Sequence, residues 1–149
     1  MTPDRSGPEP LDGSRSPAGC AFCGIAAGRR PGHVLVREET VLAILSLEGH
    51  PLIMPVEHMP GLDDLDDRTG AALMRVASRV ARALRAETGC EGINLVLSDG
   101  AAAGQDVFHL HLHVKPRWID DGVVLAWDTA TIAPGERERL AVALAARLG

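Results

Sequence analysis

Short apolar or β-branched runs, broken by glycine, proline and charged residues, recur along the chain and are typical of strands. They lie at residues 34–36, 41–45, 52–54, 93–98 and 107–115, with a further candidate at 123–127. Pro55 ends the third run, and a Gly- and Ala-rich loop separates the fourth run from the fifth. The pattern therefore predicts a sheet built from short strands.

Residues 64–88 change to the helical period. Apolar residues recur there at i, i+3, i+4, i+7 and i+11, namely Leu73, Val76, Ala77, Val80 and Leu84. Aspartates between residues 63 and 67 suit the start of this helix, and Gly89 suits its end. A second helix is expected at 134–148. The order of strands, helix, strands and helix favours an α+β fold with an antiparallel sheet.

The first 18 residues are rich in Pro, Gly, Ser and charge, and they cannot bury a core. We therefore expect a disordered tail over residues 1–18 and one folded domain over residues 19–149, which suits a chain of 149 residues.

Charge and hydropathy exclude several classes of protein. The net charge is −5, so the basic footprint of a nucleic-acid-binding protein is absent. No apolar run approaches the roughly 18 residues that a membrane span needs, and the polar N-terminus lacks the apolar core of a secretory signal. We expect a soluble, cytoplasmic protein with no nucleic-acid or membrane partner.

Rare residue types gather in one stretch of the chain. The single Asn94, Gln105 and Lys115, with three of the six histidines, all fall between residues 94 and 115. We expect the chemistry of the protein to lie there.

Three of these histidines, His109, His111 and His113, alternate with apolar residues. On a strand they project from one face, about 6.6 Å apart, while their apolar neighbours point into the core. Such a face suits either a metal site or nucleophilic catalysis by a neutral imidazole, and the spacing alone leaves both open.

The run HLHLHV at 109–114 resembles the His-φ-His-φ-His-φ signature of the histidine triad (HIT) family, where φ is apolar. Residues 92–117 are similar to the C-terminal half of that family, GHPLIMPVEH at 49–58 to its Gly-His and Pro-x-x-His segment, and CAFCGIAAGRRP at 20–31 to the opening of its bacterial members. The resemblance implies a five-stranded antiparallel sheet with two helices, one long and one C-terminal, in a homodimer.

The resemblance also implies an activity, namely hydrolysis or transfer of nucleotides. His111 would attack an α-phosphorus and form a covalent nucleotidyl-imidazole that water then cleaves. A backbone carbonyl or His50 would orient the ring of His111, and His113 and Gln105 would hold phosphate oxygens and the departing group. Ser98 matches a polar position that contacts the phosphate or the leaving group in relatives.

For Asn94, pairing with local backbone is the alternative to a substrate contact. The connection between the second strand and His50 is shorter than in relatives and lacks the aspartate that takes the ribose hydroxyls. Ser46 or Glu48 would have to replace that contact. Asp106, in turn, adds a negative charge close to the expected phosphate.

The cysteine pair Cys20 and Cys23 forms a CxxC motif, which in a cytosolic protein indicates a metal or redox site more often than a disulfide. Bacterial relatives hold a structural zinc with two such cysteines, the His of the Pro-x-x-His segment and the first triad histidine. The resemblance therefore implies a closed zinc site made of Cys20, Cys23, His58 and His109.

Two other functions stay open at this stage. One is a zinc-stabilised nucleotide-binding or interaction module without turnover. The other is a metallohydrolase that holds a catalytic metal between His109, His111 and His113.

Overall fold

The structure is a computed structural model and describes residues 15–149. The expected disordered tail therefore lies, up to residue 14, outside the described residues. The chain divides after Ile119 into two units, Met1–Ile119 and Asp120–Gly149.

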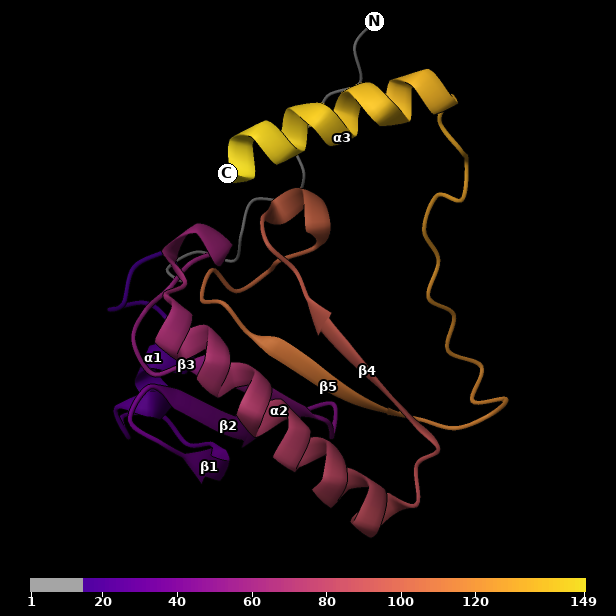
Figure 1. Cartoon of the computed structure of the whole chain (residues 1–149). Coiled ribbons are helices and arrows are strands. Elements are labelled where there is room, and N and C mark those ends of the chain that lie inside the picture. The colour runs from indigo at the N-terminus through magenta and orange to yellow at the C-terminus, as the bar shows by residue number, and fades with distance from the viewer. Residues whose placement is uncertain (1–14) are drawn as a thin grey trace, which may run out of the picture. The chain divides into compact units, whose positions relative to one another are not determined.

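The first unit contains a five-stranded antiparallel sheet in the order β1-β2-β3-β5-β4 (Figure 1). Its elements are α1 (Ala21–Ala26), β1 (His33–Arg37), β2 (Val41–Leu45), β3 (Pro51–Pro55), α2 (Asp67–Thr88), β4 (Gly92–Leu97) and β5 (Leu112–Arg117), with short 3-10 turns at Leu62–Asp64 and Ala101–Ala103. This arrangement confirms the predicted α+β class and the number of strands.

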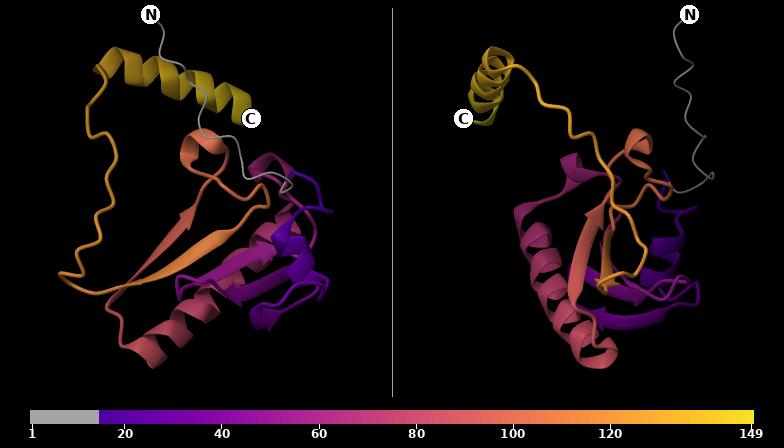
Figure 2. Two further views of the ribbon diagram at one scale, coloured as in Figure 1. Left: turned by 180° about the vertical axis from the view of Figure 1, so that it is seen from behind. Right: turned by 90° about the vertical axis from the view of Figure 1, so that its right-hand side faces the viewer.

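The two faces of the sheet are covered by different helices (Figure 2). The apolar side of α2 packs on one face, and α1 packs on the other. The α2 face buries Val41, Ala43, Ile53, Ala72, Leu73, Val76, Ala77, Val80, Leu110, Leu112 and Val114. The α1 face buries Cys20, Phe22, Leu42, Ile44, Leu52 and Met54. Successive residues of β2 and β3 thus serve opposite cores, as the period of a strand requires.

The ends of α2 follow from local chemistry. The Asp66 side chain accepts a hydrogen bond from the Thr69 N–H (2.9 Å), which caps the first turn. Gly89, with φ +67°, ends the helix in the left-handed conformation that glycine adopts at little cost. Both boundary signals of the sequence are confirmed.

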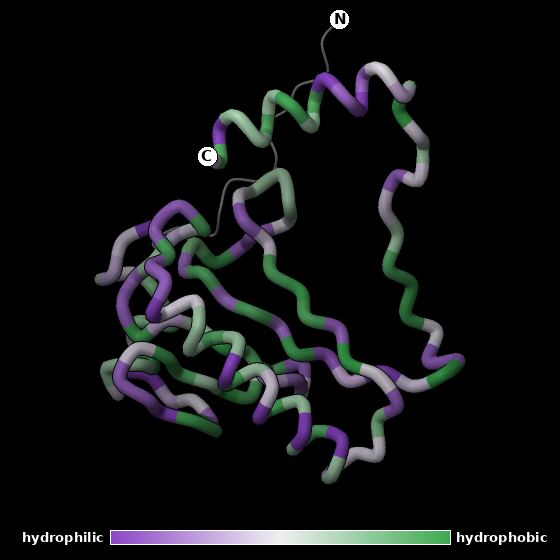
Figure 3. Tube along the Cα trace, viewed as in Figure 1, coloured by the Kyte–Doolittle hydropathy of each residue, from purple (hydrophilic) through white to green (hydrophobic). Residues whose placement is uncertain are grey.

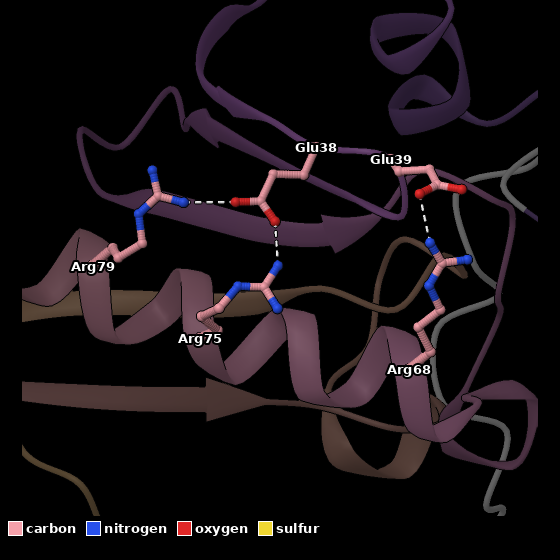
Figure 4. A network of polar contacts seen from close by, with 5 residues as sticks. All are labelled: Glu38, Glu39, Arg68, Arg75 and Arg79. Atoms are coloured by element: carbon pink, nitrogen blue, oxygen red, sulfur yellow. Dashed lines mark hydrogen bonds and ion pairs between the residues drawn. The ribbon is translucent and has the colours of Figure 1, made fainter.

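The arginine side of α2 is held to the β1–β2 turn by ion pairs (Figure 4). Glu38 accepts from Arg75 and from Arg79 (2.6 Å), and Glu39 pairs with Arg68 (2.5 Å). The hydrogen bond from Arg75, followed by the contact with Arg79, lowers the pKa of the Glu38 carboxyl. These three arginines of α2 therefore form ion pairs with glutamates of the same domain.

The predicted strand over 107–115 begins later than expected, at Leu112. Its ladder with β3 joins Leu52 to His113 and Ile53 to Leu112. Beyond it stands Pro55, which has no N–H to donate, so the ladder is not continued and the Leu110 N–H instead bonds to the Met59 carbonyl (2.6 Å). Only His113 of the three alternating histidines is a strand residue.

Two further differences concern short segments. The predicted strand at 123–127 is wrong, because these residues have no ladder partner among the described residues and run as irregular backbone. Helix α1 was not predicted, since six residues with a glycine inside give too little periodicity. Its N-cap is Cys20, whose sulfur accepts from the Cys23 N–H (3.5 Å).

The second unit consists of irregular residues followed by α3 (Pro134–Leu148), which confirms the predicted closing helix. None of the α3 residues is buried within the described chain. The irregular segment also carries apolar stretches, drawn green in Figure 3. Among the described residues, no helix is both long and apolar enough to cross a membrane.

Candidate functional site

The three alternating histidines face three different partners. His109 and His111 are buried in the irregular segment just before β5, and His113 follows on the strand itself. Their rings do not converge on one point, because His109 turns to the cysteines and His113 turns to His50. This arrangement disfavours a single metal held by all three imidazoles.

His109 joins a compact cluster of potential metal ligands. Its Nδ1 lies 3.4 Å from the Cys20 sulfur and 3.5 Å from the Cys23 sulfur, and the Nδ1 of His58 lies 3.3 Å from the Cys23 sulfur. One ligand atom from each of the four residues lies within 4.8 Å of all the others. The structure thus brings together all four residues of the predicted zinc site.

The geometry of this cluster fits zinc. With Zn–S near 2.3 Å and Zn–N near 2.0 Å, the sulfur–nitrogen edge of a tetrahedral site is about 3.5 Å. The Nε2 of His109 lies 2.8 Å from the Pro55 carbonyl, which can only accept a hydrogen bond. The proton of His109 therefore lies on Nε2, and its Nδ1 lone pair faces the sulfurs.

The protonation of His109 fits a bound cation, whereas Cys23 has to lose a proton when a cation binds. Burial, first of all, lowers the pKa of His109 to about 4, so its ring is neutral at physiological pH. Burial, followed by the neighbouring Cys20, raises the pKa of Cys23 to about 11. A thiol that keeps its proton in a buried site releases it when a cation binds there, because the thiolate is the ligand.

His111 is oriented by a main-chain carbonyl. Its Nδ1 lies 2.8 Å from the His109 carbonyl oxygen, so Nδ1 carries the proton and Nε2 presents a lone pair in the neutral ring. Phe22 of α1 packs edge-on against this imidazole, with ring centroids 5.1 Å apart. Of the two orienting groups that the sequence left open, the carbonyl is the one that contacts His111.

His50 instead pairs with His113. The His50 Nε2 lies 2.8 Å from the His113 Nδ1, and the rings of His111 and His113 are 5.0 Å apart. On its other side, the His50 Nδ1 lies 3.3 Å from the Ser46 hydroxyl and 3.5 Å from the Glu48 carboxylate. Ser46 and Glu48 are therefore engaged with His50.

A pocket of about 600 Å³ opens beside His111 and His113. Its wall is mainly apolar, and its charged residues are Arg30, Glu48 and Asp106. Apolar side chains from α1, β2, β3 and the loops complete the wall, namely Ala21, Phe22, Ile25, Ile44, Leu45, Leu47, Leu52 and Val107. The size and lining are those of a small-molecule site.

Three residues predicted to contact substrate, Gln105, Asn94 and Ser98, are not among the residues that line this pocket. The Gln105 amide accepts from the Gly100 N–H (2.7 Å) and donates to the Pro60 carbonyl (2.8 Å), so it fastens the loop before the histidines. Asn94 accepts a hydrogen bond from Arg117 on the neighbouring strand. Ser98 is half-buried just after β4.

Sequence reasoning did not single out Phe22 or Arg30 as pocket residues. The CxxC motif contained the signal for Phe22, because cysteines at 20 and 23 that face His109 leave the residue between them close to the same histidine. Phe22 and His109 indeed have ring centroids 5.8 Å apart. Arg30 carried no local signal, since it stands among other arginines.

A small α+β domain combines a buried alternating histidine segment, a pocket beside it and a Cys₂His₂ cluster, and these features define a class of small α+β proteins named for its histidines. Residues 27–118 match the HIT domain, and the chain belongs to this family.

Named relatives extend the comparison. The chain is 32% identical over 136 residues to the Protein hit of Bacillus subtilis, covering 87% of this chain and 94% of that protein. It is 34% identical over 116 residues to the adenylylsulfatase HINT3 of Arabidopsis thaliana, covering 75% of this chain and 59% of that protein. A zinc-bound histidine triad family protein from Mycobacterium smegmatis superposes with a TM-score of 0.67 at 35% identity, covering 92% of this chain and all of that chain.

Proposed function

We propose that the protein is a nucleotide hydrolase or nucleotidyl transferase that works through a covalent intermediate on His111. The observation that carries the proposal is the hydrogen bond from the His111 Nδ1 to the His109 carbonyl, which occupies Nδ1 and leaves Nε2 as the other nitrogen of a ring that lines the pocket. Membership of the HIT family supports the class of reaction, as does the name adenylylsulfatase of the Arabidopsis relative.

In the first step, the His111 Nε2 lone pair forms a bond to the α-phosphorus of a nucleotide. The bond from that phosphorus to the leaving oxygen or nitrogen breaks, and its electron pair departs with the leaving group. The leaving group gains a proton from the pocket, and the His50–His113 pair beside His111 is the donor when it holds an additional proton on the His113 Nε2. The product is a phosphoramidate between His111 and a nucleoside monophosphate.

In the second step, water, or another acceptor in a transferase, adds to the phosphorus. The P–N bond breaks, its electron pair returns to the His111 Nε2, and the nucleoside monophosphate is released. The proton lost by the water restores the protonation of the His50–His113 pair. Atoms and charges thus return to their starting positions on the protein.

We also propose that Cys20, Cys23, His58 and His109 hold a structural zinc. When bound there, zinc would cross-link α1, the segment after β3 and the segment before β5, with no open coordination position for substrate. His109 then serves two purposes, since its ring is a ligand and its carbonyl orients His111.

A homodimer in a reducing, cytoplasmic compartment completes the proposal. The exposed apolar residues of the unit Asp120–Gly149 support association with a second copy. The thiols of Cys20, Cys23 and Cys90, all unbridged, suit a compartment in which thiols stay reduced.

Intact-protein mass spectrometry tests the central claim. Wild type and His111→Ala are exposed briefly to a panel of nucleoside phosphoramidates, dinucleoside polyphosphates and adenylyl sulfate. The reaction is quenched at mildly alkaline pH, because phosphoramidates are labile in acid. We expect one nucleoside monophosphate on wild type and none on the variant.

The matched control is His33→Ala, which removes a different imidazole from the pocket wall and should still form the adduct. Unchanged zinc content and melting temperature of His111→Ala would show that its loss is chemical. Turnover that survives in His111→Ala would refute the mechanism. Tight nucleotide binding without cleavage of any substrate would instead favour a zinc-stabilised binding module.

A further inference from the structure

The loop between β2 and β3 places a carboxylate behind His50. The loop turns tightly, since the Ser46 N–H donates to the His50 carbonyl (2.9 Å) and the Gly49 N–H donates to the Ser46 carbonyl (3.0 Å). Gly49 adopts φ +82°, a conformation that side-chain-bearing residues avoid. The turn brings the Glu48 carboxylate within 3.5 Å of the His50 Nδ1.

The same carboxylate oxygen of Glu48 lies 3.5 Å from the Lys115 ammonium. Lys115 stands two residues after His113 on β5, so both side chains project from the same face of the sheet. Glu48 therefore connects the loop to the histidine strand, and a negative and a positive group flank the His50–His113 pair.

Hydrogen bonding fixes how this pair holds its protons. The His50 Nδ1 faces the Glu48 carboxylate, which can only accept, and the Ser46 hydroxyl oxygen, which already accepts from the His50 main-chain N–H; we therefore assign the His50 ring proton to Nδ1. The His50 Nε2 then accepts from the His113 Nδ1 (2.8 Å), which leaves the His113 Nε2 without a proton in the neutral pair. When the His113 Nε2 binds a proton, the positive charge can pass through this hydrogen bond to His50, next to Glu48.

We propose that Glu48 is a positioning residue of the active site, which holds the His50 proton on Nδ1 and offsets the charge that the His50–His113 pair takes up when His113 binds a proton. The positively charged Lys115 instead disfavours a positive charge on the His50–His113 pair. This inference rests on the proposed function, because it assigns a role to the pair that donates and recovers the proton. The shortened loop thereby supplies a carboxylate that tunes the proton donor.

The surroundings of both rings are consistent with this assignment. His50 is faced by Ser46, Glu48, Lys115 and His113. Burial lowers the pKa of His50 most, Lys115 lowers it further and Glu48 raises it. Burial likewise lowers the pKa of His113 to about 4, with His111, His50 and Lys115 acting in the same direction and Glu48 against them.

The test compares two variants that remove opposite charges, Glu48→Gln and Lys115→Met. Glu48→Gln should lower the pKa of the His50–His113 pair, and Lys115→Met should raise it, each by about half a pH unit for partly exposed groups. The limb of the pH–rate profile of kcat/KM that reports this pair should move in the same two directions. These signs hold whether the pair acts as an acid or as a base.

Histidine NMR titration provides a second readout that needs no substrate. The His50 and His113 ring signals are assigned with single substitutions and followed in wild type and in both variants. Glu87→Gln is the control, because it removes an exposed carboxylate of α2, which covers the opposite face of the sheet, and should shift neither signal.

Opposite shifts for Glu48→Gln and Lys115→Met would support the assignment, because a merely structural role of this ion pair would change both variants in the same way. Shifts in one direction for both, or none beyond those of Glu87→Gln, would overturn it. Opposite NMR shifts without turnover of any nucleotide in wild type would support the role of Glu48 in the pair and contradict the proposed function instead.

Discussion

Each of the residues His109, His111 and His113 has its protons fixed by a different neighbour. His109 donates to the Pro55 carbonyl, His111 donates to the His109 carbonyl, and His113 pairs with His50. Histidines two positions apart thus differ in which ring nitrogen bears the proton and in what the ring faces, because the hydrogen bond at one ring nitrogen decides whether the other is a donor or an acceptor.

The sequence predicted that Cys20, Cys23, His58 and His109 lie together, because two short motifs and their family resemblance name these four residues. It did not predict the role of Glu48, since no rule of spacing indicates which way an exposed loop residue points. Gln105 shows the opposite case. A lone polar residue beside a histidine motif predicted a substrate contact, which stays a prediction, while its hydrogen bonds to the surrounding backbone could not be predicted from the sequence.

Arg30 leads to a prediction on substrate affinity. It is the one arginine among the residues that line the pocket, and its side-chain stem lies against Gly24, where an added Cβ would come within 2.8 Å of it. We expect Arg30→Ala to raise KM about tenfold with little change in kcat, because the guanidinium can bind an anionic group or stack on a base away from His111.

The control is Arg29→Ala, which removes the same charge from the adjacent position outside the pocket lining. Steady-state kinetics on the preferred nucleotide measures both variants. Equal KM values for the two variants would contradict a role of Arg30 in binding.

The low pKa of His113 leads to a prediction on stability. Burial lowers this pKa from 6.5 to about 4, so between these pH values the unfolded chain binds a proton that the folded chain does not. The free energy of unfolding should therefore fall as the pH decreases from 6.5 towards 4. Urea unfolding across this range should show a shallower fall for His113→Asn than for wild type, and an unchanged slope would contradict the assignment.

At the scale of elements, regular periodicity decided what could be predicted. Helix α2 and strands β1 to β4 follow clear patterns with recognisable ends. Helix α1 is too short to show a pattern, and the late start of β5 depends on Pro55 of another strand. The apolar run at 123–127 lacks a ladder partner in the described chain, and hydropathy alone does not provide one.

The position of α1 leads to a prediction on zinc. Cys20 caps this helix and Cys23 lies inside it, so two of the four ligands come from one short element. We expect one zinc per wild-type chain by elemental analysis and almost none for Cys20→Ser. The melting temperature of Cys20→Ser should also be lower, because a helix of six residues is not stable without such a cross-link.

Cys90→Ser provides the matched control, since Cys90 is buried after α2 and lies outside the cluster. It should retain zinc. Removal of the metal by a strong chelator should reproduce the lowered melting temperature of Cys20→Ser in wild type. A full zinc content in Cys20→Ser would contradict the proposed ligand set.

At the scale of the whole molecule, the order of elements predicted the α+β class. The structure of the unit Asp120–Gly149 was the part least well predicted from the sequence. Helix α3 was predicted, but a surface against which it packs was not, because amphipathic periodicity does not indicate which surface an apolar side binds. Leu140, Leu144 and Leu148 are spaced by one turn along it and are all exposed. Trp127, in the preceding segment, is 75% exposed.

We expect a second copy of the chain to cover part of this apolar surface. Light scattering coupled to size-exclusion chromatography should give twice the chain mass of 15.7 kDa for wild type. Leu144→Asp should shift the population towards monomer, whereas Glu138→Gln, on the same helix, should not. A wild-type mass of one chain at micromolar concentration would contradict the homodimer.

The ring of His109 belongs to the cluster of proposed zinc ligands, and its carbonyl accepts a hydrogen bond from His111, the proposed nucleophile. Loss of zinc would release the ring, and the carbonyl that keeps the proton on the His111 Nδ1 would lose its fixed position. Turnover would then fall before the β-sheet unfolds, because α2 packs on the opposite face of the sheet and does not depend on this cluster.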